Sequence, residues 1–276
     1  MKRALLVGIN NYPDPDNKLN GCLNDIADMA AFLNGHCGFA KSAIRLLTDR
    51  RATTKAITER LAWLIKGVRP GDTLFFHYSG HGAQVATRSG KGELDGLDEV
   101  ICPVDFDWKD AHMIKDKDFQ KIFSKIPKGV DFIWVSDSCH SADLSRAFTA
   151  KLLVAAPTKT KPRRILPPPD LEWRIRAAKE NKVKEMTMAK APVGLNVALI
   201  SGCKSDQTSA DAYIKGRYNG AMTYHLLAEL RKRSGQSQDL KKLVSKVNAA
   251  LKGKFTQQPQ IEGAGYIISK GFLHYK

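Results

Sequence analysis

The sequence predicts an α/β protein in which a mainly parallel sheet carries helices on both faces. Short apolar runs, each about as long as a buried strand, recur along the chain. Stretches with apolar residues at helical spacing lie between them, an alternation typical of parallel strands joined by helical crossovers. No internal repeat is visible. With 276 residues and 43% hydrophobic content, the chain can bury a substantial core.

The predicted strands are apolar runs that begin and end abruptly. The first reads RALLVGI and the second TLFFHY, and both suit a strand that is buried on its two faces. In chain order the predicted strands span 3–9, 73–78, 99–104, 130–137 and 195–202.

The predicted helices carry apolar residues three and four positions apart. In the first, Leu23, Ile26 and Leu33 fall on one face, and the second repeats this pattern with Thr and Glu near its start. In chain order the predicted helices span 20–34, 53–66, 118–126, 219–233 and 239–251.

One segment, residues 151–192, breaks the alternation because it is rich in Lys, Arg and Pro. It holds eleven Lys or Arg against four Asp or Glu, and it predicts an exposed basic linker in which 173–183 forms a short surface helix. The linker separates a larger part, 1–150, from a smaller part, 193–276. Because both parts contribute strands to one sheet, we expect a single domain over 1–276.

Composition excludes several classes of protein. The formal net charge of +16 favours polyanions or acidic surfaces by long-range attraction. The five cysteines are odd in number and include no Cys-x-x-Cys pair, which argues against a disulfide framework or a zinc site. No run approaches the roughly 20 apolar residues of a membrane helix, and the apolar start is too short for a signal peptide. We expect reduced thiols, no membrane partner and a cytoplasmic location.

Two strands end in residues that together support nucleophilic chemistry. His81 lies between two glycines after the strand 73–78, and Cys139 follows the strand 130–137. Because the carboxyl ends of parallel strands meet at one sheet edge, these two side chains are expected to lie close together. An imidazole beside a thiol can activate it as a nucleophile and then protonate a leaving amine. Asp137 would disfavour a thiolate by its charge, so we assign it to holding a positive substrate group.

Several separated motifs resemble those of metacaspases, the caspase-like cysteine peptidases. "YSGHG" at 78–82 and "DSCHS" at 137–141 look like the catalytic histidine and cysteine motifs of that family. Four further stretches also resemble it in the right order: "GCLNDIADM" at 21–29, "DGLDEVICPVD" at 95–105, "ISGCKSDQTSAD" at 200–211 and "YNGAMTYHLL" at 218–227. The likeness covers nearly the whole chain and is greatest to prokaryotic members.

The resemblance implies the caspase fold, with a central, mainly parallel six-stranded sheet between helices, and hydrolysis of peptide bonds after Arg or Lys. By matching positions, Cys139 is the nucleophile and His81 the general base and acid, with an oxyanion hole formed by the N–H groups of Gly82 and Cys139. The matching substrate-binding residues are Cys22, Asp25, Ser79 and Asp137. No cofactor is required for the chemistry, and metacaspases are typically monomeric.

Many metacaspases are activated by calcium. The candidate metal ligands here are Asp95, Asp98, Glu99, Asp116 and Asp118. The family has adjacent acids where this chain has the run 114–118, in which lysines alternate with aspartates. Calcium prefers several oxygen ligands, so a calcium site and a solvated loop of mixed charge both stay open.

A peptidase with this specificity and an exposed basic segment is expected to cut itself within 151–190. The candidate cleavage residues are Lys161, Arg163 and Arg164. Three alternatives stay open: a catalytically silent interaction module, weak nucleic-acid binding through net charge, and an Asp-specific peptidase. The last would need basic residues in the substrate pocket, where the matched positions are acidic.

Overall fold

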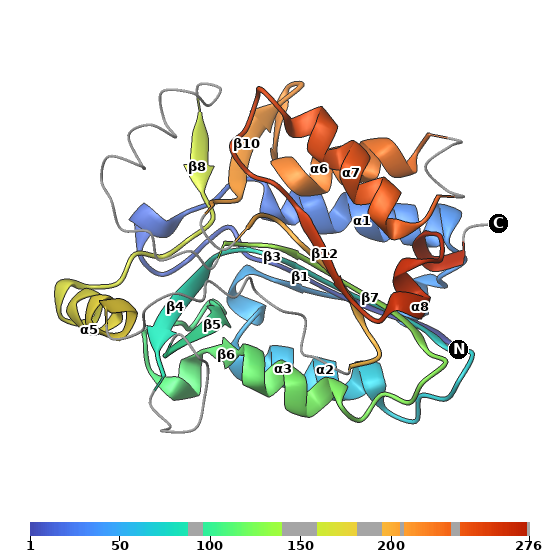
Figure 1. The fold of residues 1–276 in the computed structure, drawn as a ribbon, viewed down its shortest axis with the longest axis horizontal. Coiled ribbons are helices and arrows are strands. Elements are labelled where there is room, and N and C mark those ends of the chain that lie inside the picture. Colours follow the sequence, from blue (N-terminus) through green and yellow to red (C-terminus); the bar gives the residue numbers. More distant parts are fainter. Residues whose placement is uncertain (88–95, 140–158, 181–194, 205–206, 233–237, 275–276) are drawn as a thin grey trace.

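The computed structural model describes residues 1–87, 96–139, 159–180, 195–204, 207–232 and 238–274. A central sheet of six strands has the order β12-β9-β7-β3-β1-β2 (Figure 1). The strands are β1 (Lys2–Gly8), β2 (Ile44–Thr48), β3 (Thr73–Ser79), β7 (Asp131–Asp137), β9 (Ala198–Ser201) and β12 (Gln260–Gly263). All neighbouring pairs are parallel except β12 and β9. The predicted six-stranded, mainly parallel sheet is confirmed.

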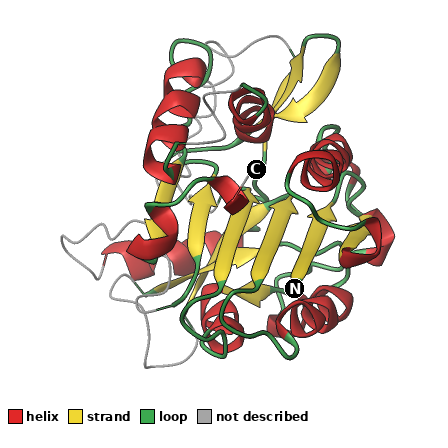
Figure 2. Cartoon of the chain, turned by 90° about the vertical axis from the view of Figure 1, so that its right-hand side faces the viewer, coloured by secondary structure: helices red, strands yellow, loops and turns green. Residues whose placement is uncertain are grey.

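Helices cover both faces of this sheet (Figure 2). On one side lie α1 (Cys22–His36), α6 (Ala221–Leu230) and α7 (Leu240–Leu251), and on the other α2 (Thr54–Ile65) and α3 (Asp116–Phe123) (Figure 1). The short α8 (Gly265–Ile268) follows β12. The layers follow from strand alternation: Leu5 of β1 packs in the same cluster as Leu61 of α2, whereas Leu6 packs with Ile26 of α1.

Two small antiparallel sheets flank the main one. The first has the order β4-β5-β6 and the second β11-β10-β8. The strands are β4 (Gly82–Ala86), β5 (Leu97–Ile101), β6 (Ile114–Lys115), β8 (Thr160–Pro162), β10 (Ala210–Ile214) and β11 (Arg217–Gly220). The strand predicted at 99–104 is therefore β5 and lies outside the main sheet. The helix predicted from residue 219 begins at Ala221, because the preceding residues pair with β10.

The sequence analysis missed both edge strands of the main sheet, β2 and β12. Only Leu47 of the five residues of β2 is buried, and no residue of β12 is, so both stretches lack the continuous apolar run of a central strand.

The prediction of an exposed loop is wrong for part of the basic linker. Thr160–Pro162 pairs with β10, and Arg163 and Arg164 are only 0% and 7% exposed. The short helix is confirmed as α5 (Pro169–Glu180), which begins earlier than predicted, at a proline that suits the first helical position. Residues 181–194 lie outside the described part of the chain.

The register of the main sheet brings three strand ends together. Gly8 of β1 pairs with Ser79 of β3, and Ser79 pairs in turn with Asp137 of β7. A Cβ atom at Gly8 would lie 2.8 Å from the carbonyl oxygen of Cys22, so the glycine lets α1 begin close against this edge. The N-terminus of α1 and the ends of β3 and β7 therefore converge.

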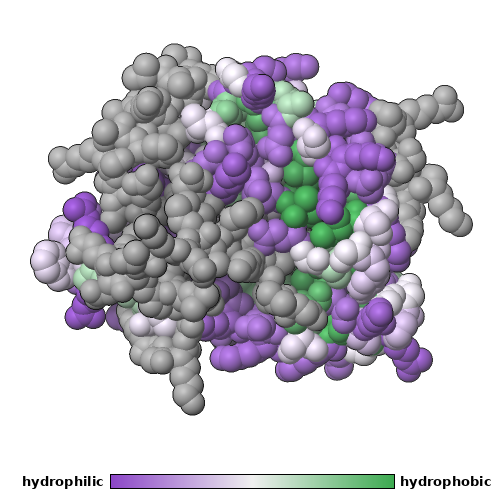
Figure 3. Space-filling view, in the orientation of Figure 1, coloured by the Kyte–Doolittle hydropathy of each residue, from purple (hydrophilic) through white to green (hydrophobic). Residues whose placement is uncertain are grey.

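The opposite edge of the main sheet is β12. Figure 3 shows a band of hydrophobic residues down the right-hand half of the face seen in Figure 1, where β12 and α8 lie.

The predicted monomeric state stays a prediction. Among the described residues, no helix has both the length and the apolar character needed to cross a membrane.

Candidate active site

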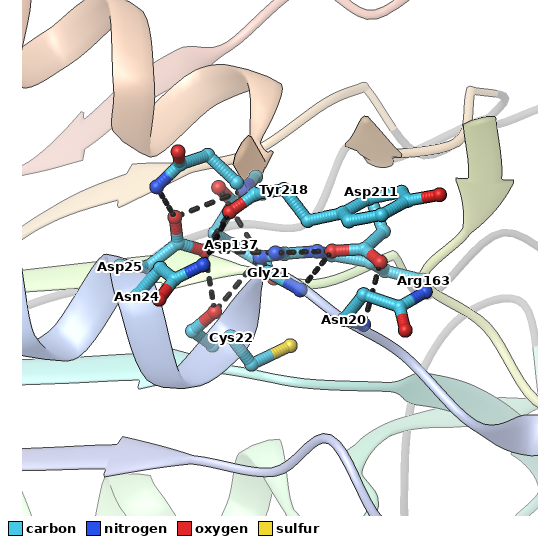
Figure 4. A network of polar contacts seen from close by, with 12 residues as sticks. Asn20, Gly21, Cys22, Asn24, Asp25, Asp137, Arg163, Asp211 and Tyr218 are labelled. Carbon is cyan, nitrogen blue, oxygen red and sulfur yellow. Dashed lines mark hydrogen bonds and ion pairs between the residues drawn. The ribbon is translucent and has the colours of Figure 1, made fainter. Parts of the chain in front are cut away.

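The side chain of Arg163 fills an acidic pocket at the converging strand ends (Figure 4). Its Nη2 donates to Asp25 Oδ2 at 2.7 Å and to Asp211 Oδ1 at 3.1 Å. Its Nη1 donates to Ser79 Oγ at 2.8 Å and lies 3.4 Å from Asp137 Oδ2. All these side chains are fully buried, so one guanidinium is enclosed by three carboxylates.

Asp25 is held in place through both carboxylate oxygens. Oδ2 accepts from Ser79 Oγ at 2.8 Å, and Oδ1 accepts from Gly220 N at 2.9 Å and Asn219 Nδ2 at 3.1 Å. Burial raises the pKa of Asp25, and the adjacent guanidinium of Arg163 opposes that rise. Asp25 is therefore oriented to accept from a cation without moving.

The other two carboxylates are fixed by different elements. Asp211, at the paired end of β10, accepts from the backbone N–H groups of Asn20 and Gly21 at 2.8 and 2.9 Å. Asp137 Oδ2 accepts from Thr223 N at 3.0 Å and from Thr223 Oγ1 at 2.7 Å at the start of α6. Each carboxylate of the pocket is thus held by hydrogen bonds besides those with Arg163.

Cys22 contributes a neutral wall to this pocket. It is fully buried, and burial raises the pKa of its thiol. Its backbone N–H donates to Asn10 Oδ1 at 2.9 Å, which fixes the first residue of α1. All four predicted substrate-binding residues, from Cys22 to Asp137, therefore lie together around the Arg163 side chain.

The backbone of Arg163 is held as well as its side chain. Its carbonyl oxygen accepts from Gly82 N and from Cys139 N, each at 3.2 Å. Its own N–H donates to Ser209 O at 2.9 Å, and Ile165 N donates to Gly82 O at 3.1 Å. The two N–H groups predicted to form the oxyanion hole therefore converge on one peptide carbonyl, that of Arg163.

His81 is oriented by two contacts from outside its own strand. Its N–H donates to the Tyr12 hydroxyl at 2.9 Å, and its Nε2 lies 2.7 Å from the carbonyl oxygen of Asn17. Because a carbonyl only accepts, Nε2 carries the proton and Nδ1 is left to accept one. Within the described residues, Nδ1 has no hydrogen-bond partner. Burial lowers the pKa of His81 to about 4, so the imidazole is neutral.

Cys139 is fully buried in this structure, and its Sγ donates to the carbonyl oxygen of Gln207 at 2.6 Å. Its backbone N–H therefore faces Arg163, whereas its thiol faces Gln207. His140 and Ser141 of the same motif lie outside the described residues.

Of the three residues predicted as cleavage sites, only Arg163 lies in the acidic pocket. Lys161 is exposed, and its Nζ donates to Lys18 O at 3.0 Å. Arg164 is buried, but none of its described contacts is with the pocket carboxylates.

Sequence reasoning missed two pocket residues, Asp211 and Gly220. A Cβ atom at Gly220 would lie 2.2 Å from Asp137 Oδ2 and 2.5 Å from Arg163 Nη1, so only glycine leaves room for the guanidinium. Both residues belong to stretches that resemble metacaspase motifs, 200–211 and 218–227. That position within the motifs was the available signal, but the role of each depends on strand pairing that spacing does not reveal.

The described calcium candidates are arranged around lysines. Asp98 is 1% exposed, and its Oδ1 accepts from Lys117 Nζ at 2.5 Å and from Thr87 Oγ1 at 3.0 Å. Its Oδ2 lies 3.7 Å from Lys115 Nζ. The negative charge of Asp98 is therefore already neutralised by ammonium groups of the same chain.

The other candidates that the structure describes do not complete a calcium site. Asp118 Oδ2 accepts from the Lys115 N–H at 3.2 Å at the start of α3, where Asp116 also lies. Glu99 follows Asp98 on β5 and points to the opposite face of that strand. Asp95 lies outside the described residues. Among the described residues, no group of three or more His, Cys, Asp or Glu side chains is placed to hold a metal. The candidates that the structure describes do not by themselves form a calcium site.

Comparison with known proteins finds relatives along nearly the whole chain. Residues 1–265 match the family model described as Caspase domain. The chain is 33% identical to Metacaspase-1A of Aspergillus oryzae and 34% identical to Metacaspase-1A of Aspergillus niger. Each alignment covers 94% of this chain and 67% or 69% of the relative. Protein GSU0716 from Geobacter sulfurreducens has a similar solved structure, with a TM-score of 0.70 and 25% identity over 99% of this chain and 98% of that one.

The match along nearly the whole chain agrees with the observed six-stranded sheet and with the motifs at its carboxyl edge. The chain belongs to the caspase-domain family and is a cysteine-type endopeptidase of the metacaspase kind.

Proposed function

We propose that the protein hydrolyses peptide bonds after Arg or Lys through Cys139 and His81, and that it cuts its own chain between Arg163 and Arg164. One observation carries this proposal. The Arg163 side chain lies among three carboxylates while its carbonyl oxygen accepts from the N–H groups of Gly82 and Cys139. An arginine bound at both positions presents its own peptide bond for cleavage.

The proposed reaction requires Cys139 Sγ, which here donates to Gln207 O, to turn toward His81 Nδ1. His81 Nδ1 takes the proton from Cys139 Sγ, and the sulfur attacks the carbonyl carbon of Arg163. The negative charge that develops on the carbonyl oxygen is stabilised by the two N–H groups. The protonated His81 then gives its proton to the leaving amine of Arg164, and the C–N bond breaks. Water, deprotonated by His81, hydrolyses the remaining thioester and releases the carboxylate.

The pocket favours Arg over Lys. A guanidinium presents several donors in one plane, and here its Nη atoms donate to Asp25, Asp211 and Ser79 together. A lysine ammonium has a single nitrogen, so it cannot donate to Asp25, Asp211 and Ser79 together as the guanidinium does. A substrate with Asp at the same position would meet three carboxylates and be repelled.

Mass spectrometry of the full chain, combined with fluorogenic peptides ending in Arg, Lys or Asp, tests the proposal. Wild type should yield fragments 1–163 and 164–276 and cleave the Arg and Lys peptides. Cys139→Ala should stay intact and cleave none, while Cys37→Ala, which removes a remote buried thiol, should behave as wild type. A folded wild-type chain that cuts neither itself nor any peptide would favour a catalytically silent module.

Self-cleavage should tolerate acid better than hydrolysis of short peptides. While Arg163 covers the site, burial keeps the pKa of His81 at about 4, so the base stays neutral at mildly acidic pH. Once Arg163 has left, water reaches the imidazole and its pKa returns toward the usual value of about 6.5. We expect the self-cleavage rate to stay unchanged as the pH is lowered to about 5. The rate of peptide hydrolysis should already fall near pH 6. Single-turnover rates across pH check this, and two coincident profiles would contradict it.

Cleavage should not need calcium. The ammonium group of Lys117 already neutralises Asp98, and the described candidates do not form a metal site. We expect equal rates of Arg-peptide hydrolysis with millimolar calcium and with excess chelator. Lys117→Met should lower the free energy of unfolding by about 2 kcal/mol, because Asp98 loses its closest charged partner. Lys121→Met, at an exposed position of α3, is the matched control. Activity that disappears with chelator would refute this expectation.

A further inference from the structure

The chain downstream of Arg163 contacts the body of the enzyme as closely as Arg163 itself. Ile165 is 8% exposed and belongs to the main hydrophobic cluster, and its N–H donates to Gly82 O at 3.1 Å. Arg164 forms a parallel bridge with the same Gly82. The second residue after the proposed cleaved bond is therefore buried, and its backbone position is set by β4.

The next element, α5, packs against β4 and β5 through one face (Figure 1). Leu171, Ile175 and Ala178 are four and three residues apart, which places them on one side of the helix. Ile175 is 1% exposed and packs with Leu97 of β5, whereas Trp173 is 75% exposed. The helix therefore packs against the strands through its apolar side and leaves Trp173 exposed.

The contact between α5 and the sheet leaves space. A half-open pocket of about 330 Å³ lies between them, lined from the body by Val85, Thr87 and Trp108 and from the helix by Leu171, Trp173, Arg174 and Ile175. The surface can therefore accept side chains larger than those of α5. Its lining, apolar except for Thr87 and Arg174, favours a helix with an apolar stripe over an extended polar segment.

We propose that the β4–β5 surface beneath α5 is a docking site for the part of a substrate that follows the cleaved bond. It selects polypeptides in which the cleaved Arg is followed by an apolar residue at the second position. An amphipathic helix then follows, with apolar residues about 8 and 12 positions after the Arg, as Leu171 and Ile175 follow Arg163. This inference rests on the proposed cleavage after Arg. The chain's own residues 164–180 are the first occupant of the surface.

A substrate must displace α5 to reach this surface. Because α5 is joined to the enzyme by its own chain, its effective concentration at the surface is high. An isolated helix of this length is marginal in water, so part of the docking free energy is spent on ordering the helix. The docking site is therefore best tested in an enzyme whose own α5 has been weakened.

The test uses the full chain carrying Leu171→Asp and Ile175→Asp, after self-cleavage is complete by mass. Four peptides are compared: residues 160–163 with a C-terminal fluorophore, residues 160–180, and the longer peptide with either Ile175→Asp or Arg176→Asp. Arg176 is exposed on α5 and pairs with Glu172, so its change is the matched control. The values of KM and kcat for the longer peptides are obtained by chromatography of the products.

For the weakened enzyme we expect KM for the unchanged long peptide to be about 10-fold lower than for its Ile175→Asp form, a difference of about 1.4 kcal/mol. The Arg176→Asp peptide should have the same KM as the unchanged long peptide. The value of kcat should be the same for the three long peptides. A peptide of residues 160–166 with Ile165→Asp should lose about 10-fold in kcat/KM against its parent. Equal KM values for the unchanged and Ile175→Asp peptides would overturn the docking site. Cleavage of the short fluorogenic peptide in the same samples would show that the peptidase proposal still stands.

Discussion

Arg163→Gln is expected to abolish cleavage between residues 163 and 164 and to destabilise the fold by about 3–5 kcal/mol. The guanidinium is the only cation among three buried carboxylates in the described pocket, and glutamine cannot neutralise them. The free energy of unfolding should be measured in urea on chains that also carry Cys139→Ala, so that no cut chain contributes. Self-cleavage should be followed by mass spectrometry on chains that keep Cys139.

The destabilisation should shrink as the pH is lowered. Burial raises the pKa of Asp25, and without the guanidinium of Arg163 that rise is no longer opposed. A carboxyl group with a raised pKa favours the folded state at low pH, and that contribution is lost as the pH rises through the raised value. Lys161→Gln, at an exposed position two residues away, should change neither stability nor cleavage. A cut that persists after position 163 in Arg163→Gln would contradict the proposed recognition.

Asp25→Asn is expected to lower kcat/KM for Arg peptides by about 100-fold. Both oxygens of Asp25 accept hydrogen bonds, Oδ1 from Gly220 N and Oδ2 from Ser79 and Arg163. An asparagine amide would turn an NH2 group toward one of these donors and would remove a charge-assisted hydrogen bond to the substrate. Steady-state kinetics on matched Arg and Lys peptides checks this.

Asp28→Asn is the control for that substitution. Asp28 lies on the same helix, but its partner Arg217 is largely exposed, and surface ion pairs of this kind contribute little. The control should hydrolyse Arg peptides as wild type does. An Asp25→Asn enzyme with unchanged kcat/KM would show that Asp25 does not bind the substrate cation.

Much of the framework was predictable because local pattern and topology agree. The apolar runs that become β1, β3 and β7 are buried on both faces, so they are continuous in sequence and easily recognised. The rule that parallel strands end at one edge was enough to bring His81 and Cys139 to the same side. The resemblance to metacaspases placed Ser79 and Asp137 in one pocket, and the two residues pair directly in the sheet.

The predictions that failed concern contacts between segments far apart in the chain. Arg163 lies in a stretch that is basic and proline-rich, a composition typical of exposed linkers, and it is nevertheless fully buried. Its burial depends on Asp25 and Asp211, which are 138 and 48 residues away. A charged residue of this kind is buried only where partners are already assembled, and composition carries no information about them.

The sequence by itself determined the central strands β1, β3, β7 and β9, the helices that cover them, the family motifs and the placement of His81 and Cys139 at one sheet edge. Hydrophobic periodicity and strand direction are local properties, so they can be read without a partner. Only the tertiary structure decided which arginine fills the acidic pocket and which carboxylate joins Asp25 and Asp137 there. It also decided that lysines, not a described metal site, neutralise Asp98. Each of these depends on Coulomb interactions and hydrogen bonds between distant segments, whose strength is set by distance and burial in the folded chain.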